Sequence, residues 1–186
     1  MGDFFQVIVD RDAGESEAAS LAEAVLDWLT SEEIVEADAT PCLNGLDDLG
    51  YAPGPKMESW VPDADQARQT RSLRTNGLEL VTDKTVFWSV STEYEAVCPN
   101  GHAHVPPEDW LDLAGEWQAD GGPALMECPT CHGSFSVTEW DFGHGFAFGY
   151  LGFRFWNWPF PLAGELIQGV AKLVAPHRVA LVYSKL

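Results

Sequence analysis

Basic residues are scarce in this chain, and one long segment has none. The 186 residues carry ten Lys and Arg against 29 Asp and Glu, a formal net charge of −19. No Lys or Arg lies between Lys84 and Arg154, and Arg11 is the single base in residues 1–55. Because Lys and Arg supply most of the affinity for phosphate backbones, we expect no binding to nucleic acid. The excess acid fits either a solvated surface or a surface that meets a basic protein.

Long apolar runs are also missing. No stretch of about eighteen apolar residues occurs, so we expect no membrane-spanning helix. Residues 1–9 lack the basic region and the long apolar run of a secretory leader. The four cysteines are not arranged as a disulfide framework, since three of them lie in short clusters with metal-ligand spacing. We therefore expect a protein of the reducing cytoplasm.

Apolar residues make up 46% of the chain and aromatic residues 12%, which is the composition of a folded protein. The length suits one domain that carries a small insertion, and two full-size domains are not expected.

Two clusters of metal-binding residue types stand in the middle of the sequence. They are Cys98-Pro-Asn-Gly-His102 and Cys128-Pro-Thr-Cys131. Thiolate and imidazole are the ligands that zinc prefers, and a short step between two ligands lets one tight turn supply both. A set of three cysteines and one histidine is typical of a closed structural site. The sequence therefore predicts a structural Zn²⁺ ion held by Cys98, His102, Cys128 and Cys131.

The identity of the fourth ligand is less certain than that of the cysteines. His102 is favoured because it completes the first cluster, but His104 and His132 lie nearby. If residues 101–105 are extended, alternation places His102 and His104 on the same side of the strand. All three histidines are therefore candidates, with His102 preferred.

The clusters resemble the zinc-ribbon group, in which two CPxC-type knuckles at the tips of β-hairpins clamp one metal ion. Cys128-Pro-Thr-Cys131 matches one knuckle in full. The first cluster departs from the pattern, because a histidine one residue later replaces the second cysteine. The resemblance covers residues 95–138 and implies an inserted zinc-ribbon-like unit there.

An open zinc site with a bound water would instead indicate a zinc-dependent hydrolase. Such a site needs a general base near the metal, for which Glu108, Glu127 and Glu139 are candidates. The zinc-deaminase signature fails, since the stretch reads His102-Ala-His104 and the proline lies inside the cysteine pair. The His-Glu-x-x-His, phosphate-loop, Gly-x-Ser-x-Gly and dinucleotide motifs are also missing. We therefore assign no catalytic residue, and the hydrolase remains the alternative.

The remaining sequence predicts an α+β fold. Apolar periodicity indicates one helix that Ser16 caps and that continues to about Leu29, and a second helix after Pro161. Residues 37–67 show no regular pattern, which indicates either a functional loop or short helices that the pattern does not reveal. Thr82-Asp83-Lys84 is typical of a hairpin turn. The order approximates β-α-β-β-α-β, a ferredoxin-like (split βαβ) antiparallel sheet with helices on one face. Its core comprises residues 1–94 and 139–186. Strands are expected at 4–9, 78–81, 85–90, 94–97, 134–138, 150–158 and 178–184.

The segment Phe153-Arg-Phe-Trp-Asn-Trp-Pro-Phe160 is unusually aromatic. Core packing is the favoured interpretation, because strands of this composition fill the space under helices. If the strand lies at a sheet edge, its Arg154, Trp156 and Trp158 are our candidates for a partner-binding surface. Cys42, alone in a Pro- and Gly-rich segment, is expected to be a small buried residue.

These features favour a non-enzymatic, zinc-binding acidic protein that docks a basic protein partner, in the manner of immunity proteins or antitoxins that block toxic nucleases. The sequence does not indicate the oligomeric state.

Overall fold

The structure is a computed structural model that describes residues 2–45, 48–90, 95–105, 110–120, 122 and 124–186. Its largest element is a six-stranded sheet in the order β12-β1-β11-β4-β3-β2, in which all neighbours are antiparallel. The predicted α+β class is therefore confirmed. The strands of this sheet are β1 (Phe4–Asp10), β2 (Val35–Pro41), β3 (Leu49–Pro53), β4 (Gly77–Val81), β11 (Leu151–Trp156) and β12 (Val179–Lys185).

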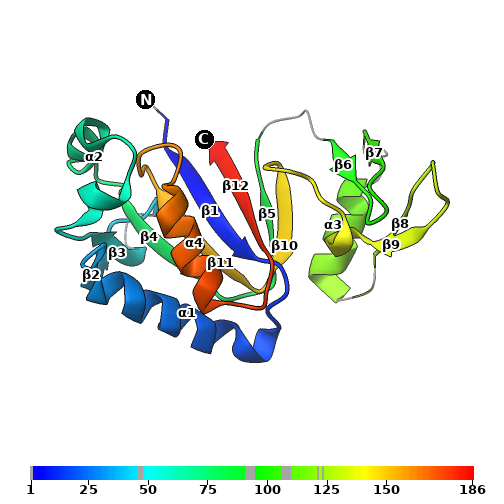
Figure 1. Cartoon of the computed structure of the whole chain (residues 1–186), viewed down its shortest axis with the longest axis horizontal. Helices are drawn as coiled ribbons and strands as arrows, with labels where there is room; N and C mark the ends of the chain where they lie inside the picture. Colours follow the sequence, from blue (N-terminus) through cyan, green and yellow to red (C-terminus); the bar gives the residue numbers. More distant parts are fainter. Residues whose placement is uncertain (1, 46–47, 91–94, 106–109, 121, 123) are drawn as a thin grey trace.

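Two helices, α1 (Glu15–Ser31) and α4 (Gly164–Leu173), lie together on one face of the sheet (Figure 1). The buried residues of α1 recur at helical spacing and pack on Ile8, Phe153 and Phe155. Helix α1 begins at Glu15, so Ser16, the predicted N-cap, lies inside its first turn. Its N-cap is Gly14, whose N–H donates to Oε1 of Glu17 at 2.9 Å, so Glu17 supplies the capping carboxylate. The buried stripe of α1 is Ala18, Ala22, Val25 and Leu29.

The opposite face is covered by a two-stranded ribbon of β5 (Thr85–Trp88) and β10 (Phe146–Gly149). Phe87 and Ala147 of this ribbon belong to the same buried cluster as Val7, Val9 and Val182 of the sheet. Side chains on alternate positions of β1 thus enter two different cores, as the period of a strand requires.

The predicted hairpin between residues 78–81 and 85–90 is wrong. Strand β4 pairs with β11 in the large sheet, whereas β5 pairs with β10. The β4–β11 ladder ends with Val81 opposite Gly152, and the β5–β10 ladder begins with Thr85 opposite Gly149. Both segments of the chain bend between the two ladders, and we call this bend the corner. A Cβ at Gly149 would overlap the carbonyl oxygen of Asp10, so the corner needs a glycine there. Residues 82–84 therefore pass from one sheet to the other.

Residues 37–67 hold more regular structure than their sequence predicts. They contain most of the edge strand β2, strand β3, the 3₁₀ turn η1 (Met57–Trp60) and the start of α2 (Ala64–Thr70). Beyond Val35, all of β2 is exposed, so no apolar alternation marks it. Met57 and Ala67 are buried in the core beneath the helices, and Cys42 is buried as expected.

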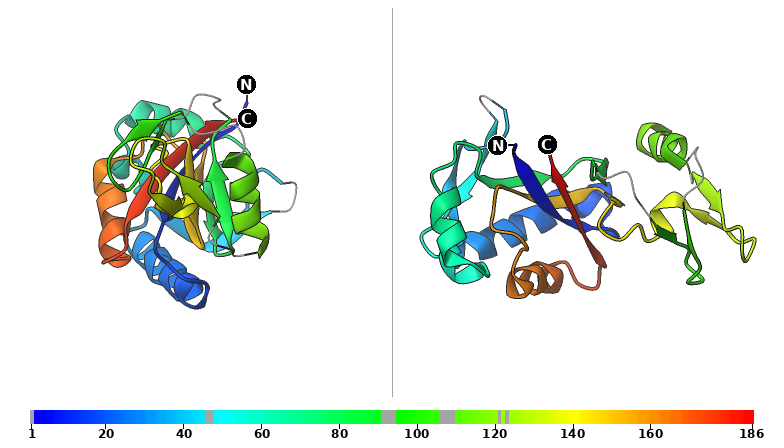
Figure 2. Two further views of the ribbon diagram at one scale, coloured as in Figure 1. Left: turned by 90° about the vertical axis from the view of Figure 1, so that its right-hand side faces the viewer. Right: turned by 90° about the horizontal axis from the view of Figure 1, so that it is seen from above.

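A second core lies at the other end of the molecule from α2 (Figure 2). It is built on two short hairpins and one helix, and it includes the buried Cys98 and Cys128. Trp140, Phe142 and Phe148 pack in the same core, so the aromatic residues that follow position 138 support the two hairpins. The elements are β6 (Ala96–Val97), β7 (Ala103–His104), α3 (Trp110–Asp120), β8 (Leu125–Glu127), β9 (Ser134–Ser136) and η2 (Val137–Glu139).

Most of the aromatic segment is buried, whereas Phe160 at its end is 49% exposed. Strand β11 lies between β1 and β4, so it is not at a sheet edge. Trp158 has no exposed surface and Trp156 is 6% exposed, as the core interpretation predicts. Arg154 donates to both oxygens of Glu79 at 3.0 and 3.1 Å, and the indole of Trp156 donates to one of them. The condition under which these residues were candidates for partner binding is thus not met.

Among the helices in the described ranges, none is long and apolar enough to cross a bilayer.

Candidate metal centre

Two tight hairpin turns present the cysteines and the histidine. In the first, the N–H of Cys98 donates to the carbonyl of His102 at 3.0 Å, and Gly101 has a φ of 84°. In the second, the N–H of Cys128 donates to the carbonyl of Gly133 at 2.9 Å, and His132 has a φ of 54°. Each turn therefore contains one residue in the left-handed conformation.

The left-handed residue differs in position between the two turns. His102 follows the left-handed Gly101, whereas Cys131 precedes the left-handed His132. This difference accounts for the altered spacing of the first cluster, where the ligand-type residue comes one position later. Glycine adopts the conformation at no steric cost, so the sequence Asn-Gly-His is suited to the first turn.

The four predicted ligands converge. The ligand atoms of Cys98, His102, Cys128 and Cys131 all lie within 4.8 Å of one another, a cluster that could hold a metal ion. Nδ1 of His102 is 3.4 Å from Sγ of Cys98 and 3.8 Å from Sγ of Cys128. In a tetrahedral zinc site, bonds of about 2.3 Å to sulfur and 2.0–2.1 Å to nitrogen separate neighbouring ligand atoms by about 3.5–3.8 Å. The observed spacing fits that arrangement.

The three candidate histidines occupy different positions. His102 belongs to the cluster. His104 lies beside it, with Nε2 at 3.3 Å from Sγ of Cys128. His132 is 77% exposed in its side chain, and its Nδ1 is 3.3 Å from Oε1 of Glu127. The geometry favours His102 as a ligand, places His104 as a neighbour of a ligand, and directs His132 elsewhere.

Hydrogen bonds and burial set the protonation of the thiols. The side-chain amide of Asn100 donates to Sγ of Cys131 at 3.4 Å, which lowers the pKa of Cys131 to about 6. Burial opposes ionisation of Cys98, but hydrogen bonds from His102 and Asn100 outweigh it and lower its pKa. Burial raises the pKa of Cys128. Two of the three sulfurs are thus held in surroundings that favour the thiolate, the form that binds metal.

Two of the three candidate general bases, Glu127 and Glu139, are engaged outside the cluster. Oε2 of Glu139 accepts the N–H of Ser136 at 2.9 Å in a capping box, and Glu127 pairs with His132. Glu108 lies outside the described residues. The described carboxylates therefore give no indication of a general base at the metal cluster.

Two residues that stabilise this region by hydrogen bonds, Asn100 and Arg11, were not predicted from the sequence. Asn100, which lies inside the first cluster, donates to Cys131 of the second and so links the two turns. Arg11 donates from Nη2 to the carbonyls of Thr138 and Trp140 at 2.7 and 2.9 Å, which ties the end of β1 to the second core. Arg11 is the single basic residue in residues 1–55, and this isolation could have indicated that it makes a specific contact.

Comparisons of the chain with known protein families, with curated proteins and with solved structures give no match.

Proposed function

We propose that Cys98, His102, Cys128 and Cys131 hold one structural Zn²⁺ ion in a zinc-ribbon-like unit that spans residues 95–138. The convergence of four donor atoms from two hairpin turns supports this proposal more than any other observation. Three thiolates and one imidazole form a soft donor set, which favours zinc over magnesium or calcium. The ion would join two hairpins that are too short to be stable alone.

We further propose that the remaining residues, 1–94 and 139–186, form a ferredoxin-like domain interrupted by this unit. The strand order β12-β1-β11-β4 supports this assignment, with α1 following β1 and α4 preceding β12. Strands β3 and β2 extend the sheet at the β4 edge. Such a scaffold supports many functions, so the function must be argued from surfaces and sites.

For the whole chain, we propose a non-enzymatic module that binds a basic protein, as immunity proteins and antitoxins do with toxic nucleases. The net charge of −19 and the absence of Lys and Arg between Lys84 and Arg154 support an electrostatically steered association. A closed set of four protein donors leaves no position for the water that a zinc hydrolase requires. The metal therefore has a structural role in this proposal, and the acidic surface recognises the basic partner.

Affinity chromatography on the immobilised, zinc-loaded chain tests this function. We expect a basic protein to be retained at low ionic strength and released as salt increases, because surface charges are screened within a Debye length. A variant with both Asp112→Lys and Glu116→Lys, two exposed residues of α3 in the segment without Lys or Arg, should weaken retention. A variant with both Glu23→Lys and Asp27→Lys, two exposed residues of α1, is the charge-matched control. Retention that does not respond to ionic strength, or retention of acidic proteins alone, contradicts the proposal.

A further inference from the structure

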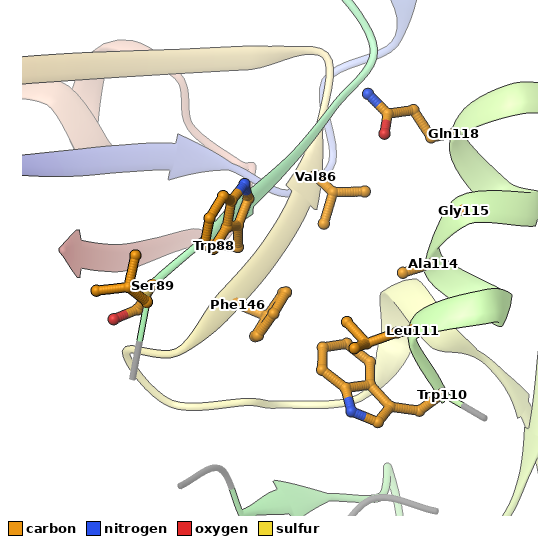
Figure 3. A pocket seen from close by; sticks show the side chains of 10 residues that line it. Val86, Trp88, Ser89, Trp110, Leu111, Ala114, Gly115, Gln118 and Phe146 are labelled. Atoms are coloured by element: carbon orange, nitrogen blue, oxygen red, sulfur yellow. The ribbon is translucent and has the colours of Figure 1, made fainter. Parts of the chain in front are cut away.

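An apolar groove separates the β5–β10 ribbon from α3 (Figure 3). Its volume is about 620 Å³, within the range of ligand pockets. The segment through β5 forms one wall, α3 forms the other, and Phe146 of β10 lies between them. We call this cavity the β5–α3 groove.

The strand wall consists of Val86, Trp88, Ser89 and Val90. Val86 and Trp88 are alternate residues of β5, and Ser89 and Val90 follow the end of the strand. Alternate residues of an extended segment point to the same side. Trp88 is 52% exposed and Val90 is 47% exposed, so this wall offers a large apolar surface to solvent. Tryptophan is among the residues that contribute most to binding energy at protein interfaces.

The helix wall follows one stripe of α3. Leu111, Ala114, Gly115 and Gln118 line the groove at positions i, i+3, i+4 and i+7. Leu111 is 57% exposed, and a Cβ built on Gly115 would meet no atom within 4 Å. Ala114 and Gly115 at the centre of the stripe are small, so they leave open space between α3 and the strand wall.

The base of the groove is connected to the metal cluster. Trp110 and Phe146 meet edge to face with their ring centroids 4.3 Å apart. Both residues belong to the buried core that also contains Cys98 and Cys128. The shape of the groove thus depends on the same packing that positions the metal ligands.

Acidic side chains border the helix wall. Asp112 and Glu116 are exposed and lie four residues apart, so they share one face of α3. With about 3.6 residues per turn, this face is about 100° around the helix from Leu111 and Gly115, on the solvent side of the groove. Lys84 contacts Trp117, whose ring packs on Phe148 and Tyr150 on another side of α3. Among the described residues that line the groove, none is basic. An apolar groove with a negative border matches a ligand that is apolar on one side and positive on the other.

We propose that the β5–α3 groove binds an amphipathic helix of a basic protein, with its apolar residues in the groove and its Lys or Arg residues beside Asp112 and Glu116. This inference rests on the proposed function, which supplies the basic character of the partner. The walls are side chains of a strand and a helix, so binding is of the helix-in-groove kind. The stripe from Leu111 to Gln118 extends about 10 Å along α3, which corresponds to about two turns of a bound helix.

The test uses the zinc-loaded full chain and a fluorescent peptide of about four helical turns. The peptide carries Leu at helical i, i+3, i+4 and i+7 spacing and Lys elsewhere. Two control peptides keep the composition with scrambled Leu positions, or replace every Lys by Glu. Fluorescence anisotropy measures the affinity. We expect the first peptide to bind, and each control peptide to bind at least about tenfold more weakly.

The decisive variant is Gly115→Leu, which fills the groove from inside. It should fold, because Leu has a higher helix propensity than Gly and its Cβ meets open space. We expect it to weaken peptide binding by about tenfold or more. Gly164→Leu in α4 is the matched control, since a Cβ there also meets no atom within 4 Å, and it should leave the affinity unchanged.

Several outcomes overturn the proposal. Equal affinity of the native chain and Gly115→Leu excludes the groove, and salt-dependent retention of a basic protein in the chromatography would then still support the proposed function. A Lys peptide that does not bind, or a Glu peptide that binds equally, excludes a basic helix as the occupant. Self-association of the native chain that Gly115→Leu abolishes in sedimentation would identify a second copy as the occupant instead.

Discussion

Nε2 of His104 lies 3.3 Å from Sγ of Cys128, although His104 is not among the four clustered donors. His104 is the last residue of β7, and His102 lies two residues earlier, directly before that strand, so a proposed ligand and a neighbour of another ligand are close in sequence. Groups that hydrogen-bond to metal ligands orient them and tune their affinity for the ion. His102 and His104 should therefore differ in a measurable way.

We expect His104→Ala to keep one metal ion with an affinity reduced by about 10- to 100-fold, the usual effect of losing a neighbour of a ligand. His102→Ala should lose the tightly held ion, because it removes a donor. Competition with a chromophoric chelator measures both affinities, and His144→Ala, which lies outside both ligand turns, serves as the control. The reverse order of effects for His102 and His104 would reassign the fourth ligand.

Asp10 and His177 predict a pH dependence of stability. Asp10 is fully buried, its Oδ1 accepts the N–H groups of Asp12 and Ala13, and its Oδ2 lies 2.9 Å from Nδ1 of His177. This hydrogen bond raises the pKa of His177, and Glu17, whose Oε1 is 3.9 Å from Nε2, acts in the same direction.

Because the folded-state pKa of His177 exceeds its unfolded value of about 6.5, the stabilisation is complete below that value and is lost as pH rises through the folded-state pKa. We expect the free energy of unfolding in urea to fall as pH rises above about 6.5. His177→Gln should remove this component, and His144→Gln is the control. A native chain and a His177→Gln variant with parallel pH profiles would contradict the assignment.

Arg11 predicts a coupling between the sheet and the second core. Its guanidinium is partly buried, and this burial lowers the pKa of Arg11. The same guanidinium donates hydrogen bonds to the carbonyls of Thr138 and Trp140. Arg11→Met should cost about 1.5–3 kcal/mol, the range for hydrogen bonds to a charged group. Arg68 forms an ion pair with Glu58, and its side chain is 56% exposed. Arg68→Met should therefore lower the free energy of unfolding by only about 0–1 kcal/mol. Equal losses in urea unfolding would show that Arg11 has no special role.

Two helical glycines should respond in opposite directions to a methyl group. A Cβ at Gly115 in α3 meets open space, so Gly115→Ala should stabilise the chain by about 0.5–1 kcal/mol. A Cβ at Gly169 in α4 would overlap the ring of Trp28, which itself meets Trp60 edge to face. Gly169→Ala should therefore destabilise by about 1–3 kcal/mol. Thermal unfolding measures both changes, and stabilisation at Gly169 would mean that Trp28 moves freely.

Local patterns allowed the elements with strong periodicity to be predicted. Phe4 to Val9 indicated β1, the stripe from Ala18 to Leu29 indicated α1, and the spacing of cysteine and histidine indicated the cluster of donor atoms that could hold a metal ion. These features depend on residues that are near in sequence, or on a donor chemistry with few alternative uses.

Long-range pairings account for what could not be predicted. Strand β5 pairs with β10, more than fifty residues later, and the local turn at residues 82–84 gave no sign of that partner. Strand β2 lies at the edge of the sheet with its side chains in solvent, so Glu36 and Asp38 hide its strand character. The links made by Asn100 and Arg11 also join distant segments, and their geometry appears only when the chain is folded.

Metal content and cobalt spectroscopy of the purified full chain test the central claim most directly. We predict one zinc ion per chain, and a Co²⁺-substituted protein with the intense visible bands of tetrahedral, thiolate-rich coordination that do not change when exchangeable anions are added. Cys131→Ser should lower the retained metal. A chain that retains no zinc, or a cobalt spectrum that responds to added anions at an open coordination position, would contradict a closed structural site.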